Sequence, residues 1–563
     1  MQLEGRAAPD ASAFKINRLF NGTGYSPYTT TLIDFAISGV EPEELPMDSS
    51  TRKSGLGHHR QAGVCFGKRG EFLTAHLLPA GHIFTVEGQA IPVEREEDAL
   101  DILAYLNTPL VRFSINKYCG QHKYSGYVNL LPFVRLSESS EARAMVSRAI
   151  NASETARKYD EVQHLFEGVS SVRSFEDWAD EVRLAVEAAR QTAVDCEGYC
   201  ERQLRELLAV SDEEALVIDR FRETQPPCEP AIEDADIDSG CRWIAAHSLV
   251  SFALGCVFGR WELREELKNT DFSLTRALEK FGPFPPAMRR AGPHLDAHER
   301  AILVYDPTHG DHIEDRLRDL LSVLFCGSLT ENESHLASAL QTDSLSEYVR
   351  RSDGLFGDHL RRYSKSRRKA PIYWQLATPS AAYSVWLYLH AFTNDTLYKV
   401  QNDYVAPKLA HEQRKLESLC RDVTETPKAV ERKALAAQET FVDELRAFLE
   451  EVKRVAPLWN PNLDDGVIIN FAPLWRLVPQ HKPWQRELKA KCDELAAGKY
   501  DWARLAMHLW PERVVPKCAT DRSLAIAHGL EEVFWVEGPD GKWQRGGRGR
   551  KAHVDTRIDR RRP

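Results

Sequence analysis

The chain has 563 residues, of which 43% are hydrophobic and 28% charged, and its formal net charge at pH 7 is -10. This composition, with twelve Trp residues, excludes a low-complexity or intrinsically disordered protein. Its length predicts roughly three or four globular cores rather than one.

Two features of the sequence predict a cytoplasmic protein. The first residues lack the basic segment and apolar core of a secretory signal. The eleven cysteines include no CxxC motif, and the closest pair, Cys196 and Cys200, has helical spacing without further partners for a zinc site. We therefore expect reduced thiols.

An α+β module is predicted over residues 1–136. Residues 1 to about 60 are rich in turn-forming residues and look irregular. From Gly63 to Phe133 short β-like runs broken by Gly and Pro precede a helical pattern, DALDILAYLNTPLVRFSINKY. We expect Leu77–Phe84 to lie in or beside a strand.

Helical patterns then dominate the chain. Apolar residues three and four apart predict a helical spacer over residues 137–224, and the Pro-rich, acidic segment 225–238 is the predicted domain boundary. The apolar run Trp243–Phe258 is shorter than the roughly 20 residues that a bilayer requires, and His247 and two Ser residues interrupt it. It predicts a buried core helix rather than a membrane span.

The second half divides into three predicted parts, and together they make the expected fold class α+β, multidomain and predominantly helical. These parts are a mixed α/β region over 239–406 with a basic stretch, a helical C-terminal region over 407–540 and a basic disordered tail over 541–563. A long helical section is predicted from Pro407 to Val455, interrupted at ETPKAV and poor in buried polar groups.

The basic stretch is notable in an acidic chain, because six of the nine residues from Arg361 to Lys369 are Lys or Arg. Such a run is either a solvated surface or a site for nucleic-acid phosphates, which clustered cations bind whatever the net charge of the molecule. Tyr373 and Trp374, which follow a Pro, belong either to a strand that enters the core or to a platform that stacks on bases.

The same stretch carries a resemblance. FGDHLRRYSKSRRKAPIYWQLATPSAAYSVWLYLHAF, followed by TLYKVQNDYVAPKL, resembles the C-terminal region of large adenine-specific DNA methyltransferases. These are the enzymes of the BREX and DISARM phage-defence systems, related to type IIG restriction-modification enzymes. Further similar segments, in the family's order, are GKRGEFLTAHLLPAGHIFTVEGQA, LDILAYLNTPLVRF, LVSFALGCVFGRWE, NLDDGVIINFAPLW and GKYDWARLAMHLWPERVVPKC.

The resemblance implies that the chain recognises and grips double-stranded DNA, with the module around Lys68 to Phe133 as part of target recognition. The complete enzyme would use S-adenosylmethionine, and this chain would need a catalytic methyltransferase half or subunit, with other defence proteins as possible partners. The residues implied to face DNA are Lys68, Arg69, Arg361, Arg362, Lys365, Arg367, Arg368 and Lys369, with Tyr373 and Trp374 beside them.

The turns that an N6-adenine methyltransferase needs are not recognisable here. Instead of the cofactor-binding DPxxGSG turn the chain has DPTHGDH (Asp306–His312), whose last two side chains would crowd the cofactor. Instead of NPPY, which holds the flipped adenine, it has NPNLDDG (Asn460–Gly466), with Leu463 in place of the stacking aromatic. We therefore predict no catalytic residue and no cofactor on this chain.

A metal site is not predicted either. His309 and His312 stand near Asp306 and Asp311, but no other motif completes a ligand set.

Three hypotheses follow from the sequence. The leading one is the DNA-binding, target-recognition portion of an adenine-specific methyltransferase in phage defence. The alternative is a non-catalytic scaffold that binds defence proteins through its helical sections. An independent enzyme with an unfamiliar active site is disfavoured, because no set of titratable residues has a useful spacing.

Overall fold

The computed structural model describes most of residues 61–223, 237–261, 302–422 and 428–546, together with a few residues before them. It separates into two compact units. The first consists of Met1–Arg300 with Glu314–Tyr348, and the second of Ala301–Ile313 with Val349–Pro563. Helices predominate over small, mainly antiparallel sheets, which confirms the predicted α+β class.

The predicted module is built on a three-stranded antiparallel sheet of order β4-β3-β6. Its strands are β3 (Gly63–Gly67), β4 (Ala75–Leu78) and β6 (Gly88–Pro92). The helices are α1 (Glu96–Leu106), α2 (Pro109–Tyr118) and α3 (Ser125–Val128). Apolar residues of β3 and α1, including Val64, Phe66 and Leu103, share one core. The predicted succession of short strands and then helix is confirmed.

A second small sheet joins the start of the chain to this module. Its order is β2-β1-β5, formed by β1 (Arg18–Phe20), β2 (Thr30–Thr31) and β5 (His82–Ile83). Strands therefore occur within the segment that the sequence suggested to be irregular. As expected, the segment Leu77–Phe84 contributes to strands, namely the end of β4 and all of β5, while Phe84 lies outside the described residues.

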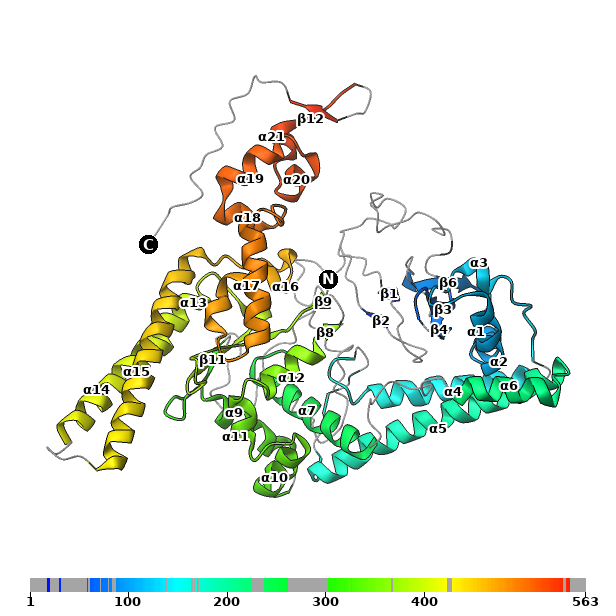
Figure 1. Ribbon diagram of the computed structural model, residues 1–563, viewed down its shortest axis with the longest axis horizontal. Helices are drawn as coiled ribbons and strands as arrows, with labels where there is room; N and C mark the ends of the chain where they lie inside the picture. Colours follow the sequence, from blue (N-terminus) through cyan, green and yellow to red (C-terminus); the bar gives the residue numbers. More distant parts are fainter. Residues whose placement is uncertain are drawn as a thin grey trace. The chain divides into compact units, whose positions relative to one another are not determined.

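The predicted spacer is helical. It comprises α4 (Ser139–Arg157), α5 (Phe175–Leu207) and α6 (Asp212–Glu223), and Figure 1 shows α4 lying along the much longer α5. Most of the predicted boundary at 225–238 lies outside the described residues, and helices from both sides of it, α5 and α7 (Ile237–Val257), pack together in the first unit. The division into five domains stays a prediction.

Helix α7 is the apolar run noted in the sequence. By length and composition its residues Asp238–Val257 suffice to cross a membrane, but 78% of the apolar stretch is buried inside the protein. Phe252 packs against Phe166 and Trp261. This is the environment expected of a core helix. The other helices of this unit are α9 (Ile313–Leu324), α10 (Leu329–Ala339) and most of α11 (Leu345–Arg350).

The second unit is centred on an antiparallel sheet of order β10-β11-β7. Its strands are β7 (Ile302–Tyr305), β10 (Tyr373–Ala377) and β11 (Ser384–Tyr388). Every residue of β10 and β11 is buried, because helices and loops cover the sheet. Helix α12 (Leu355–Arg362) precedes a short hairpin of β8 (Ser364–Lys365) and β9 (Arg368–Lys369).

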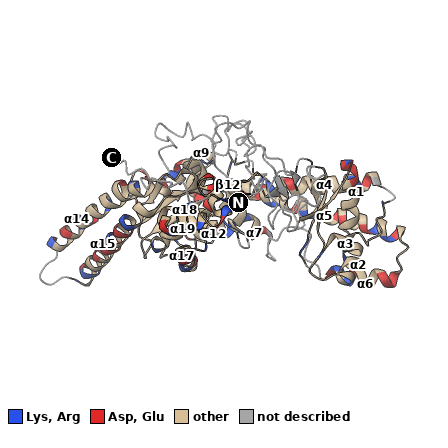
Figure 2. Ribbon diagram, turned by 90° about the horizontal axis from the view of Figure 1, so that it is seen from above, with Lys and Arg blue, Asp and Glu red and all other residues tan. Residues whose placement is uncertain are grey.

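A long helical hairpin follows, as predicted. It begins with α13 (Thr396–Lys399) and a π-helical segment, η7 (Val400–Val405), and continues with α14 (Ala406–Asp422) and α15 (Ala429–Val455). Lys and Arg alternate with Asp and Glu along α14 and α15 (Figure 2). The buried side chains of α14 and α15 are mostly apolar, with Glu412 and Gln438 as exceptions.

The chain ends in short helices around a small core of its own, which includes Leu505, Val514 and Leu524. The elements are α16 (Val467–Phe471), α17 (Lys482–Ala496), α18 (Arg504–Leu509), α19 (Pro511–Cys518), α20 (Arg522–Ala527) and α21 (Glu531–Phe534). Strands β12 (Trp535–Glu537) and β13 (Trp543–Arg545) pair after them. The start of the predicted disordered tail is thus a strand, and residues 547–563 lie outside the described residues.

Candidate nucleic-acid interface

Lys68 and Arg69 lie in a turn that is fixed to a loop 50 residues further along the chain. The Gly70 amide donates to the Gln121 carbonyl at 2.9 Å, and the Lys123 amide donates to the Lys68 carbonyl at 2.7 Å. Arg69 also forms an isolated antiparallel bridge with His122. The turn after β3 and the loop after α2 therefore form one structural piece.

Side-chain hydrogen bonds of Gln89 and Lys123 also hold the loop in place. The Gln89 side chain in β6 donates to the Lys123 carbonyl at 2.9 Å and accepts from the Ser125 amide. The side chain of Lys123 is completely buried, and its ammonium donates to the Gly120 carbonyl. Because its backbone groups are bonded within the module, the loop presents its remaining side chains from a fixed frame.

The outward side chains are cationic and aromatic, and we call them the module surface. The surface consists of Lys68, Arg69, Lys117, Tyr118, His122, Tyr124 and Tyr127. Tyr118 is 65% exposed, Tyr124 45% and Tyr127 37%. The Lys68 ammonium lies 5.2 Å from the centroid of the Tyr124 ring, within the range of a cation–π contact.

The segment that carries five of the seven residues of the module surface lacks acidic residues. Residues 102–137 contain four Lys or Arg and neither Asp nor Glu, although the whole chain has 83 acidic residues. Of these four basic residues, Arg112 and Lys123 are buried and Arg135 pairs with Asp98 and Asp101. The sequence prediction found Lys68 and Arg69 but missed the four aromatic residues of the surface. Lysines interleaved with tyrosines in KYCGQHKYSGY were a usable signal, because this pattern is typical of surfaces that bind both phosphates and bases.

Buried charges fasten α2 to the long helix α5. The Arg112 guanidinium lies 3.5 Å from Glu197, and the Arg222 guanidinium of α6 lies 3.1 Å from the same carboxylate. The Leu110 amide donates to Glu201 at 3.1 Å. Burial raises the pKa of Glu201, although this amide and an arginine oppose the rise. Helix α2 is thereby held at its N-terminal end, while Lys117 and Tyr118 stand at its other end.

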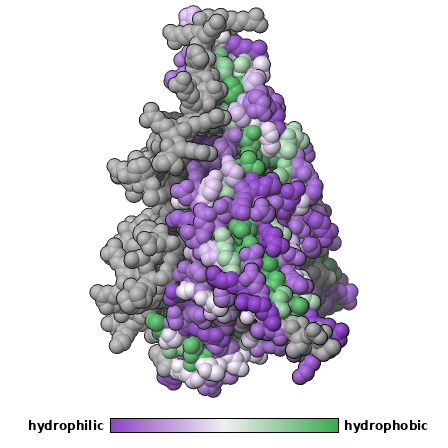
Figure 3. Space-filling view, turned by 90° about the vertical axis from the view of Figure 1, so that its left-hand side faces the viewer, coloured by the Kyte–Doolittle hydropathy of each residue, from purple (hydrophilic) through white to green (hydrophobic). Residues whose placement is uncertain are grey.

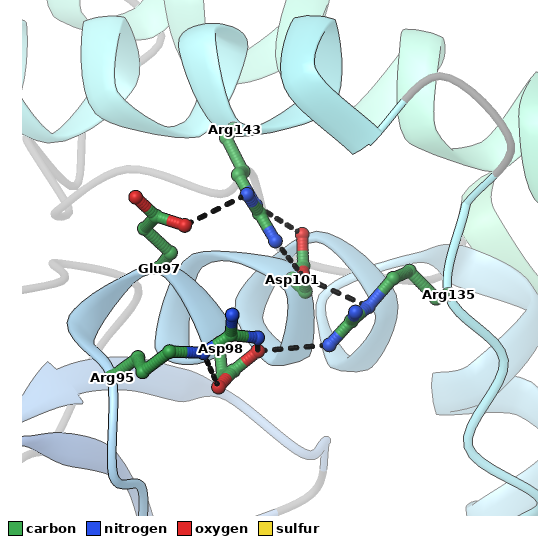
Figure 4. Close-up of polar contacts among 6 residues, drawn as sticks. All are labelled: Arg95, Glu97, Asp98, Asp101, Arg135 and Arg143. Atoms are coloured by element: carbon green, nitrogen blue, oxygen red, sulfur yellow. Dashed lines mark hydrogen bonds and ion pairs between the residues drawn. The ribbon is translucent and has the colours of Figure 1, made fainter.

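An ion-pair network fastens the module to α4 (Figure 4). Asp101 in α1, whose side chain is only 2% exposed, receives two hydrogen bonds of 2.7 Å from Arg143 and lies 3.0 Å from Arg135. Arg135 also contacts Asp98 at 2.8 Å, and Arg143 contacts Glu97 at 3.2 Å. The network joins α1, α4 and the segment that follows α3.

The predicted basic stretch lies in the second unit, and its residues differ in exposure and in the groups that they contact. The Arg361 side chain is 65% exposed at the end of α12 and forms an ion pair with the buried Asp358. Lys369 forms an ion pair with Glu487 of α17, and its ammonium lies 5.8 Å from the centroid of the Trp484 ring. Lys365 and Arg368 are paired in the hairpin. The side chains of Lys365, Arg367 and Arg368 lie outside the described residues, and Arg362 is half-buried.

Helix α17 extends this basic area. Lys482, Arg486 and Lys489 are exposed at spacings of four and three residues, which place them on one side of the helix. Burial lowers the pKa of the His481 imidazole at the start of α17, and the nearby positive charge of Arg361 lowers it further. We call Arg361, Arg362, Lys369, Lys482 and Arg486 the α12–α17 surface.

Tyr373 and Trp374 do not belong to either surface, which corrects their assignment as residues that face DNA. Both lie in strand β10 of the buried sheet and are 1% and 0% exposed. The Trp374 ring stacks on Phe471 with 3.4 Å between the centroids. Neither ring has a face available to a base, so the alternative of a strand that enters the core holds.

The DPTHGDH turn follows β7, but its residues do not fit S-adenosylmethionine. The Asp306 amide donates to His312 Nδ1 at 3.1 Å, and Lys408 of α14 contacts the Asp306 carboxylate at 2.9 Å. Burial alone would raise the pKa of Asp306, but hydrogen bonds from Lys408 and Thr308 lower it. Since the polar atoms of this turn bind the protein itself, we derive no cofactor chemistry from it.

The NPNLDDG turn is likewise occupied by internal bonds. The Asn470 side chain accepts from the Asn462 amide at 2.8 Å and donates to the Asn462 and Gly466 carbonyls. The Asp465 carboxylate accepts from the Arg504 and Leu505 amides, both at 2.7 Å, and so caps α18. The polar groups of this turn therefore bind the protein itself.

In the part of the chain that the structure describes, the acidic, His and Cys side chains and a cavity of the first unit bear on whether a metal ion or a small molecule can be held. No group of three or more His, Cys, Asp or Glu residues there is arranged to hold a metal ion. A cavity of about 50 Å³ between α1, α4 and α5 is lined by residues such as Leu103, Ile150 and Cys200. It has room for a few water molecules at most.

Two known proteins are similar to this chain. The adenine-specific methyltransferase BrxX of Escherichia coli O9:H4 (strain HS) is 22% identical over 441 residues, which cover 72% of this chain and 35% of BrxX. The adenine-specific methyltransferase PglX of Lacticaseibacillus casei (strain Zhang) is 26% identical over 249 residues, 40% of this chain and 19% of PglX. This chain is a distant relative of both methyltransferases. No protein-family model matches it.

The similarity covers only part of each relative. The chain spans about a third of the length of BrxX and a fifth of that of PglX in the matched regions. The methyltransferase activity of BrxX and PglX therefore belongs to proteins much longer than this chain. The similarity agrees with the resemblance noted in the sequence at the level of adenine-specific methyltransferases.

Proposed function

We propose that this chain is the DNA-binding, target-recognition portion of an adenine-specific DNA methyltransferase system of phage defence. The methyl transfer itself would take place on a catalytic half or subunit that binds S-adenosylmethionine. The chain would contribute grip and position on double-stranded DNA, with the module of β3, β4, β6, α1 and α2 in the target-recognition role.

The observation that carries the proposal is the module surface. Lys68, Arg69 and Lys117 stand among exposed aromatic side chains, and the loop is fixed by backbone hydrogen bonds to Lys68 and Gly70. Local cations attract phosphates even when a protein is acidic overall, since released counterions supply the affinity. The distant relationship to BrxX and PglX supports DNA as the polyanion.

The test is the salt dependence of binding to duplex DNA, measured by fluorescence anisotropy with the full chain. A variant with Lys68→Ala, Arg69→Ala and Lys117→Ala should flatten the plot of log K against log salt by about 0.9 for each lost phosphate contact. The matched control removes three exposed cations of α15, in the variant R432A/R446A/K453A. It should leave the slope unchanged. Equal slopes for the two variants, or no DNA binding, would refute the proposal.

The α12–α17 surface is a second predicted contact with phosphates. Arg361→Ala, Arg362→Ala and Lys482→Ala together should weaken binding about equally for target and non-target sequences, because phosphate contacts position a protein without specifying a base. An altered base preference with an unchanged salt slope would instead show that these residues read bases. Unchanged binding would make the basic stretch a solvated surface.

One observation favours the scaffold as a second candidate function. Large apolar side chains are exposed near the junction of α5 and α6: Leu207, Leu208, Leu216 and Val217 are between 42% and 54% exposed. Green hydrophobic patches also stand among hydrophilic side chains on the face drawn in Figure 3. If the chain binds no DNA at any salt concentration, a function in which these apolar residues bind partner proteins becomes the better candidate.

A further inference from the structure

Three aromatic side chains of the module surface stand side by side at its outer edge. The rings of His122 and Tyr124 are nearly parallel, at 13°, with 6.0 Å between their centroids. The Tyr127 ring lies 6.3 Å from that of Tyr124. Soluble proteins seldom expose several large rings together without a ligand for them.

We propose that His122, Tyr124 and Tyr127 form a platform that stacks on an unpaired base of DNA. This inference rests on the proposed function and adds to it the kind of DNA that the module prefers. A base offers a flat π face whatever its identity, and successive exposed aromatic rings are the usual protein surface for it.

The platform is fixed before any ligand arrives. The loop that carries His122 is held by the hydrogen bonds of Gly70 and Lys123, and the start of α3 is held by the bond from Ser125 to Gln89. Tyr and His side chains have only two rotatable bonds each, so little conformational entropy is lost when they are covered. A preformed surface of this kind binds more tightly than one that must first be ordered.

The charges around the rings favour a nucleic acid over a protein as the ligand. Lys68 lies above Tyr124, and Lys117 stands at the end of α2 with its ammonium 4.6 Å from the centroid of the Phe113 ring. A nucleotide with an unpaired base supplies both a π face for the rings and a phosphate for these cations. Ordinary duplex DNA supplies the phosphates alone, because its bases are already stacked on one another.

The experiment compares two DNA molecules with the full chain. One is a perfect duplex, and the other is the same duplex with a single unpaired 2-aminopurine, whose fluorescence falls when it stacks. We expect the chain to bind the second DNA more tightly and to quench it. The variant Tyr124→Ala with Tyr127→Ala should lose about 5- to 150-fold in affinity for it. Binding to the perfect duplex should change little.

Two control variants separate the explanations. Tyr124→Phe keeps the ring and should bind as the parent does, which also guards against misfolding of the double variant. Tyr398→Ala removes a tyrosine of similar exposure, 40%, in the second unit and should have no effect. Equal affinity of the parent chain for both DNAs, or equal losses for both in the double variant, would overturn the stacking inference while leaving DNA binding intact. Absence of binding to either DNA would refute the proposed function and, with it, this inference.

Discussion

Replacement of Asp101 by Asn should loosen the attachment of the module to α4. The Asp101 carboxylate is nearly inaccessible and serves two guanidinium groups, those of Arg143 and Arg135. Removal of one partner from a fully buried ion pair costs about 3 to 5 kcal/mol. The two arginines here are 23% and 48% exposed, so water compensates them in part. We therefore expect a cost of about 2 to 3 kcal/mol.

Native-state hydrogen exchange of the full chain, read by mass spectrometry, measures this cost locally. Amides of α1 and α4 whose exchange requires the two helices to separate should exchange about 30- to 150-fold faster in the Asp101→Asn variant. Amides of the second unit should keep their rates, because its core is separate.

Glu97 provides the matched control. It contacts the same guanidinium of Arg143 at 3.2 Å, but its side chain is 65% exposed. Glu97→Gln should therefore change the free energy of opening by less than about 0.5 kcal/mol. Similar exchange rates in the two variants would refute the reasoning, because burial would then not decide the value of the contact.

Three other results are expected. Hydrogen bonds, first of all from Lys491, lower the pKa of Glu494 from its ordinary 4.5 to about 2. The folded state should therefore lose stability as the pH falls from about 5 to 2. Denaturant unfolding measured across this pH range should show a smaller loss in the Glu494→Gln variant. Gln438→Leu removes the 2.7 Å hydrogen bond to the buried Glu412 and should cost about 1 to 3 kcal/mol in denaturant unfolding; a more stable variant would contradict this. Trp374→Ala should lower the free energy of unfolding by about 3 to 5 kcal/mol but leave the salt dependence of DNA binding by the folded protein unchanged. A changed salt dependence would indicate that Trp374 contacts DNA.

The sequence predicted those parts of the fold that depend on local pattern. The periodicity of apolar residues in α4, α5, α14 and α15 was sufficient, because each helix buries one side against a neighbour that follows soon in the chain. The apolar content of α7 was enough to predict a core helix. In contrast, β7 pairs with β11 across about 80 residues, and no local pattern specifies that partner.

The site was predicted only in part, for the same physical reason. Clusters of Lys and Arg are visible in any sequence, so Lys68, Arg69 and Arg361 could be named as candidates. The aromatic rings of the module surface are held in place by hydrogen bonds between the loop at 119–124 and the turn at 67–70. These bonds form only in the folded chain. Tyr373 and Trp374 were ambiguous because the same residue types suit a buried strand and a stacking platform.

The acid-free segment 102–137 has a consequence for how this chain meets a polyanion. A molecule with a net charge of -10 and cations gathered on the module surface and the α12–α17 surface has an uneven field. DNA is repelled from most of the surface and attracted at these places, so encounters are selected by orientation before any contact is made. Added salt screens the repulsion together with the attraction. Binding should then become weaker and, at the same time, less selective in the direction of approach.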